Sequence, residues 1–115
     1  MISLPSGPRI WLVAGVTDMR KSFNGLGELI QHALDENPFS RHLFIFRGRK
    51  GDTEKIRWAD ADGLCLFTKR LEEGQCIWPA VRDGKIAITR SQLATLLDKR
   101  GWRQPKTARL NSLTM

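Results

Sequence analysis

The sequence contains no tyrosine and only two cysteines. Without tyrosine, the chain cannot use a tyrosine nucleophile, which excludes the tyrosine-type DNA strand transferases. No apolar run approaches the ~20 residues that cross a bilayer. Residues 1–8 place no basic residue ahead of an apolar stretch, so no export signal is expected. We therefore expect a cytoplasmic protein without a membrane partner, in which Cys65 and Cys76 are reduced thiols.

Acidic residues are absent from the last seventeen positions, and this absence accounts for most of the charge. The chain has 19 Lys and Arg against 12 Asp and Glu, a net charge of +7, and a pI near 10.1. Such a balance favours a polyanionic partner. At 115 residues the length fits a single domain over residues 1–102, followed by a basic C-terminal tail over 103–115. The basic residues of the last seventeen positions are Lys99, Arg100, Arg103, Lys106 and Arg109.

The apolar pattern changes from helical to extended along the chain. A stripe at helical spacing from Met19 to Ala33 predicts a helix that is capped by Thr17 or Asp18 and runs to about Leu34. A capping-box pattern at residues 89–92 predicts a second helix, which ends near residue 101. Extended patterns are expected at 9–13, 42–46, 53–59, 64–70, 75–79 and 85–88.

Together these patterns predict an α+β fold. We expect a mainly antiparallel sheet of about five strands, in the order strand, helix, four-strand meander, helix. Within residues 53–59, Ile56 and Trp58 alternate with Lys55 and Arg57, which predicts one apolar face and one wet, cationic face. In the turn that follows, Gly63 is expected to supply a positive φ.

Several residue types invite a catalytic or metal-binding hypothesis. A small metal-dependent nuclease would need Asp52, Asp60 and Asp62 to converge, but turn chemistry explains these residues without catalysis. The histidines and cysteines lack the paired spacing of structural zinc sites. We therefore expect no catalytic residue, no metal site and no cofactor, with the nuclease as the alternative.

A larger pattern covers nearly the whole chain, from about Ile10 to Trp102. It resembles the TnpB accessory protein of the insertion sequence sixty-six family of bacterial transposable elements. The residues that carry the resemblance are the segments 18–21, 23–26, 38–40, 43–47, 62–64, 69–72 and 78–79, with Lys55 and Trp58.

The resemblance implies a non-enzymatic protein that acts in transposition beside a separate, element-encoded transposase of the DDE type. Two roles stay open, because the basic residues suit either DNA phosphates or an acidic surface of the transposase. The basic tail, which has no acidic residue, favours non-specific phosphate contacts with DNA, whereas the near-balanced charge of residues 1–98 favours a protein adaptor. In addition to the five tail residues, the candidate binding residues are Arg47, Arg49, Lys50, Lys55, Arg57, Lys69 and Arg70.

Overall fold

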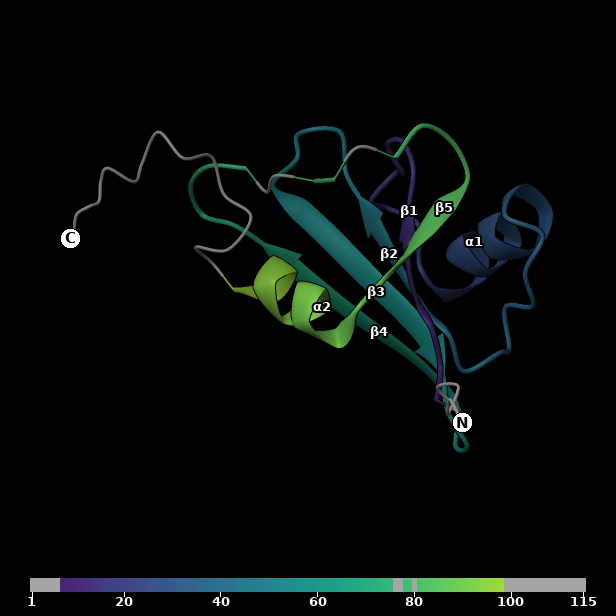
Figure 1. Cartoon of the computed structure of the whole chain (residues 1–115). Helices are drawn as coiled ribbons and strands as arrows, with labels where there is room; N and C mark the ends of the chain where they lie inside the picture. Colours follow the sequence, from purple (N-terminus) through teal and green to yellow (C-terminus); the bar gives the residue numbers. More distant parts are fainter. Residues whose placement is uncertain (1–6, 76–77, 80, 99–115) are drawn as a thin grey trace.

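The computed structural model describes residues 7–75, 78–79 and 81–98, which form one five-stranded sheet and its helices (Figure 1). The elements along the chain are β1 (Ile10–Val13), α1 (Phe23–Glu28), the π-helix η1 (Leu29–Ala33), β2 (Leu43–Arg47), β3 (Thr53–Ala59), β4 (Leu64–Arg70), β5 (Lys85–Ile88) and α2 (Arg90–Leu97). No helix among these residues is long and apolar enough to span a bilayer.

The strand order is β4-β3-β2-β1-β5, and β1–β2 is the parallel pair. The other neighbouring strands are antiparallel, which confirms the expected α+β fold. The four-strand meander is wrong in one respect. The meander contains only the three strands β2, β3 and β4. The fourth strand, β5, pairs with β1 at the opposite edge of the sheet, where Ile88 lies opposite Ile10. A parallel pair needs a crossover between its strands, and α1 and η1 lie in that connection.

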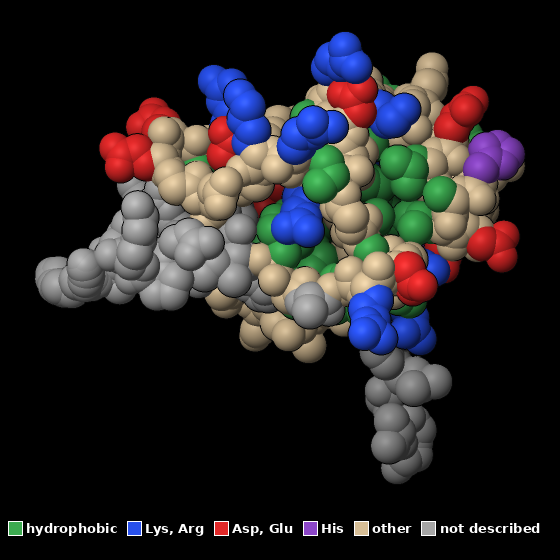
Figure 2. All heavy atoms as spheres, turned by 90° about the horizontal axis from the view of Figure 1, so that it is seen from above, with side chains coloured by type: hydrophobic (Ala, Val, Ile, Leu, Met, Phe, Trp, Pro, Cys, Tyr) green, Lys and Arg blue, Asp and Glu red, His purple; other side chains and the backbone are tan. Residues whose placement is uncertain are grey.

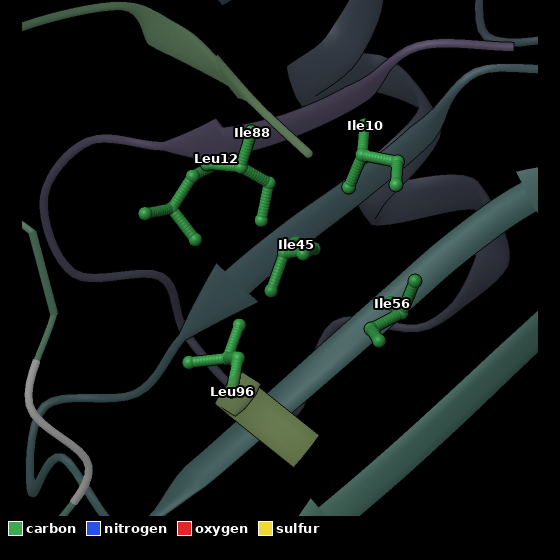
Figure 3. Close-up of a cluster of buried hydrophobic side chains, with 6 residues drawn as sticks. All are labelled: Ile10, Leu12, Ile45, Ile56, Ile88 and Leu96. Carbon is green, nitrogen blue, oxygen red and sulfur yellow. The ribbon is translucent and has the colours of Figure 1, made fainter. Parts of the chain in front are cut away.

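Each face of the sheet carries its own apolar cluster. One cluster brings Leu96 of α2 onto Leu12, Ile45 and Ile56 of the sheet (Figure 3). The other cluster brings Leu26 and other residues of the first helical segment onto the opposite face. Because successive side chains of a strand point to opposite faces, the consecutive apolar residues of β2 are buried on both sides. The sheet is therefore a middle layer between α1 and α2.

The first helix begins later than the sequence predicts. Its first residue is Phe23 and its N-cap is Ser22, so the expected cap at Thr17 or Asp18 is wrong. Thr17 instead donates its backbone N–H to the carbonyl of Arg47, at 2.8 Å, and is buried. The apolar stripe does not require the helix to start at its first member, because a loop residue can also pack on the core.

The helix also ends in a wider turn than the pattern implies. Leu34 donates to the carbonyl of Leu29, five residues back, at 3.2 Å, which is the π-helical bond of η1. This wider turn buries Leu34 and leaves Ala33 exposed. The expected end near Leu34 is confirmed, and Asp35 follows it with a φ of 56°.

Two turn and cap predictions have opposite outcomes. At α2, Gln92 donates its backbone N–H to the Thr89 hydroxyl at 3.0 Å and its side chain accepts from the Thr89 backbone, which confirms the capping box. Gly63 does not take the expected positive φ. The carboxylate of Asp60 closes that turn instead, by accepting from the backbone N–H groups of Asp62 and Gly63.

Three further predictions concern the 75–79 segment, the end of the second helix and the basic tail. The described residues of the 75–79 segment do not form the expected extended strand. α2 ends at Leu97 and its C-cap residue Asp98 is extended, so this helix ends earlier than the predicted position near residue 101. Trp102 and the whole basic stretch from Lys99 onward lie outside the described residues.

Candidate nucleic-acid interface

Three segments meet at one end of the sheet and surround an open hollow of about 740 Å³. They are the segment after β1, the loop between β2 and β3, and the end of β4. The topology brings them together, because β1 and β2 run parallel while β3 and β4 alternate in direction. Figure 2 looks onto this end of the molecule and shows Lys and Arg side chains gathered there, with Asp and Glu among them. We refer to this feature as the basic hollow, and its charged lining residues are Asp18, Arg20, Arg49, Lys50, Asp52 and Arg70.

Three predicted binding residues come together here. Arg49, Lys50 and Arg70 are all exposed and line the basic hollow from two separate segments. The loop that carries Arg49 and Lys50 is closed by the Gly51 N–H, which donates to the carbonyl of Gly48 at 3.1 Å. Gly51 has a φ of 76°, a region that glycine adopts without steric cost. The loop therefore holds its two cations outward.

Gly48 allows the segment after β1 to approach this loop. A Cβ atom at Gly48 would lie 2.5 Å from Cγ of Met19. Met19 in turn packs against the apolar cluster beneath α1. The lack of a side chain at position 48 thus lets residues 16–20 lie against the loop, which places Arg20 in the same hollow as Arg49.

Arg20 is a member of the site that the sequence analysis missed. Its Nε donates to Oδ1 of Asp18 at 3.0 Å and its Nη2 donates to Oδ2 at 2.8 Å. These hydrogen bonds from Arg20 hold the pKa of the Asp18 carboxyl well below its usual range. The Arg20 side chain is still 91% exposed, so the rest of its guanidinium faces solvent. The Asp-x-Arg spacing of the pair is the available signal, but the sequence pattern favours Asp18 as a helix cap and so hides it.

Two other candidate binding residues, Lys55 and Arg57, do not lie on a solvent-exposed face of the sheet. Arg57 is 2% exposed, and its guanidinium donates to the carbonyls of Phe23 (3.0 Å) and Pro38 (2.8 Å). Burial lowers the pKa of this guanidinium. Lys55 donates to the carbonyl of Lys21 at 2.9 Å. The prediction of a cationic, solvated face is wrong because α1 and its flanking loops cover this side of the sheet.

The remaining two described candidates lie on the opposite face, in a row across three strands. Arg47 is opposite Glu54, which is opposite Lys69. Glu54 is 1% exposed, and this burial raises the pKa of its carboxyl to about 7, while Lys69 acts in the other direction. Lys69 donates to the carbonyl of Leu97 at the end of α2. Arg47 donates to the carbonyl of Gly15 at 3.3 Å, so both cations hold the structure together.

The nuclease alternative fails on geometry. Asp52 directly precedes β3, whereas Asp60 directly follows it and Asp62 lies in the next turn. A seven-residue strand is roughly 23 Å long at about 3.3 Å per residue. No group of three or more potential metal ligands occurs within residues 7–75, 78–79 and 81–98. The Cys65 thiol donates to Oδ2 of Asp60 at 3.3 Å, and burial raises its pKa, which disfavours a thiolate nucleophile.

Comparison with known proteins supplies the family. The family model described as IS66 Orf2 like protein matches residues 8–107. The chain belongs to the IS66 Orf2 like family. Two proteins of Sinorhizobium fredii (strain NBRC 101917 / NGR234) are similar to this IS66 Orf2 like chain. The one named Uncharacterized protein y4hO is 47% identical over 90% of this chain and 91% of its own length. The one named Uncharacterized protein y4jC is 32% identical over 92% and 91%.

No solved structure matches the chain. Membership of the IS66 Orf2 like family links the chain to IS66 transposition in an accessory role. This agrees with the resemblance seen in the sequence. The basic residues of the tail lie outside the described residues, so their contacts stay a prediction.

Proposed function

We propose that this chain is a non-enzymatic accessory protein of IS66 transposition that binds the phosphate backbone of DNA through the basic hollow. A separate transposase performs the strand chemistry. The observation that carries the proposal is the convergence of Arg20, Arg49, Lys50 and Arg70 on one open, concave surface. Guanidinium and ammonium groups in exposed loops suit phosphate oxygens, which fix a protein on DNA without reading its sequence. We therefore infer sequence-tolerant binding, to which the basic tail adds further contacts.

The geometry restricts which cations contribute. Lys55, Arg57, Lys69 and Arg47 each donate to a backbone carbonyl of the protein itself, and we infer that they support the fold and not the DNA. The exposed cations of the hollow are not committed in this way. The carboxylate of Asp18 accepts a two-pronged hydrogen bond from Nε and Nη2 of Arg20, which fixes the direction of this side chain and offsets part of its charge.

The salt dependence of binding to a labelled duplex tests this proposal. Each phosphate that is neutralised on duplex DNA contributes about −0.9 to the slope of log affinity against log salt. The double variant Arg49→Gln/Lys50→Gln should flatten the slope by about 2 units if both residues contact phosphate. The matched control is Arg9→Gln/Arg41→Gln, which removes the same charge from exposed positions at the other end of the sheet. Equal losses in the two variants would contradict a defined interface.

A second candidate function is that of an adaptor that docks on the transposase. The hollow also contains Asp18 and Asp52, and the exposed side chain of Val16 lines it, so a mixed protein surface would fit there. Co-purification with the transposase, with and without element-end DNA, separates the two functions. If the intact protein shows no DNA binding at low salt but retains the transposase, the DNA function is wrong and the adaptor stands.

A further inference from the structure

β4 is an edge strand, and its outer edge is not paired within the described part of the chain. It is seven residues long, whereas the strand at the opposite edge, β5, has four. Figure 1 shows it as the outermost strand beyond β3. At its midpoint, Phe67 exposes 42% of its surface. A long edge strand with an exposed aromatic residue offers backbone hydrogen bonds and apolar surface to another strand.

The hydrogen bonds at the two ends of the β3–β4 hairpin show which residues of β4 point outward. Asp60 donates to the carbonyl of Gly63 at 2.8 Å, and Leu71 donates to the carbonyl of Asp52 at 2.8 Å. Hydrogen-bonded and non-hydrogen-bonded pairs alternate along an antiparallel ladder. Odd-numbered residues of β4 therefore bond to β3, and the backbone groups of the even-numbered residues, 64 to 70, face the open edge.

We propose that two copies of this chain associate through antiparallel pairing of their β4 strands, with the two-fold axis at Phe67. This register overlaps all seven residues. It pairs Leu66 of each copy with Thr68 of the other, and Leu64 with Arg70, through the outward-facing backbone groups. Phe67 then meets Phe67 of the second copy in a non-hydrogen-bonded pair, in which the Cα atoms are about 4.5 Å apart and side chains lie closest.

The charges of β4 fit the same register. Its cations, Lys69 and Arg70, lie at one end of the strand, so antiparallel pairing keeps the cations of the two copies apart. Arg70 comes beside Leu64 and diagonal to Asp62 of the second copy, at a distance that long side chains span. A parallel pairing in register would instead place Lys69 and Arg70 beside their own copies, and like charges directly opposite are destabilising. The occupant that the edge fits is therefore a second copy in antiparallel orientation.

Sedimentation of the full-length protein without DNA measures the association. We expect a mass of about twice 13.1 kDa and, for Thr68→Pro, a monomer. Proline removes only the outward-facing N–H of this residue, and edge strands tolerate proline where the missing N–H faces away from the sheet. Thr68→Ala is the control and should remain a dimer. A wild-type chain that stays monomeric at its highest attainable concentration overturns the proposal, as does a Thr68→Pro variant that is still a dimer.

Disulfide trapping tests the register with Phe67 at its centre. In a Cys76→Ser background, Phe67→Cys should form a cross-linked dimer under mild oxidation, because the expected Cα separation lies within the range that disulfides bridge. Phe23→Cys replaces a phenylalanine of similar exposure on α1 and should not cross-link. The native Cys65 should not pair with itself, because it faces Lys69 of the second copy. A Cys65–Cys65 cross-link, or cross-linking of Phe23→Cys equal to that of Phe67→Cys, contradicts this register.

Discussion

Arg57 in the middle of the sheet donates from Nε to the carbonyl oxygen of Phe23, the first residue of α1, over 3.0 Å. Its Nη1 also bonds the carbonyl of Pro38, beyond the end of η1. One buried guanidinium therefore holds both ends of the first helical segment against the sheet. A Cβ atom at Gly27 would lie 2.9 Å from Nη2, so glycine in the helix makes room for the guanidinium.

Arg57→Ala should therefore destabilise the protein by more than the roughly 0.5 kcal/mol that bounds most surface substitutions. We expect a loss of at least about 2 kcal/mol, because two carbonyl groups lose their partner in a buried setting. Urea unfolding measures this loss as a lower midpoint. Arg41→Ala, at an exposed position, is the control and should change the midpoint little. Similar midpoints for the two variants would show that the guanidinium does not hold the helix.

Gly48→Ala should destabilise the basic hollow through Met19. The added Cβ would lie 2.5 Å from Cγ of Met19, so one of the two segments must move. We expect a cost of about 1–3 kcal/mol, the range for overpacking. In a Met19→Ala background the same substitution should cost far less, because the clashing atoms are gone. Unfolding of the four proteins of this cycle provides the measurement, and additive losses would contradict the contact.

Glu54 should make stability fall as the pH rises through the weakly acidic range. Its pKa is about 7 in the folded protein, against 4.5 for the free side chain, so the folded state binds the proton more tightly. Stability from this group is fully present below about pH 4.5 and is lost as the pH passes 7. The loss amounts to at most about 3–4 kcal/mol, at 1.36 kcal/mol per pKa unit. Glu54→Gln should remove this component of the pH profile, and an unchanged profile in that variant would contradict the assignment.

The tail prediction depends on the DNA function proposed above. Removal of residues 103–115 deletes Arg103, Lys106 and Arg109, and should flatten the salt slope of DNA binding by up to about 3 units. The triple variant with glutamine at these positions should behave like the truncation if charge is the cause. All described elements end before residue 99, so thermal unfolding should change little. A truncated protein with the wild-type slope would show that the tail does not contact phosphate.

The sequence predicts those elements whose signals lie within a few residues. The capping box at Thr89 and Gln92 satisfies two backbone groups by itself, and the strands from residue 42 to residue 70 are joined by short turns. The position of β5 depends on a partner at the other end of the chain, and no local pattern specifies that pairing. The same holds for Arg57, since its alternation with Ile56 is identical whether a helix or water covers its face.

The candidate site was partly predictable for the same reason. Arg49 and Lys50 occur in a glycine-containing loop, which favours exposure, and the structure places both at the open hollow; their role as binding residues stays a prediction. Their convergence with Arg70 and Arg20 depends on the sheet order and on the contact between Gly48 and Met19. Charge in the sequence does not distinguish a solvated cation from one that bonds a carbonyl, which is why Lys55, Arg57 and Lys69 were grouped with the exposed residues.

The place of β1 between β2 and β5 has a consequence for how the chain folds. In a chain that lacks residues 85–98, β1 can pair with its parallel neighbour but its other edge stays open, and neither Ile88 nor Leu96 covers the cluster around Leu12. Pairing between distant parts of a chain slows folding, because the intervening loop must close first. The nascent protein thus exposes an unpaired strand edge and apolar surface until its last strand emerges from the ribosome. Fragments that end before Ile88 should accordingly aggregate when expressed alone.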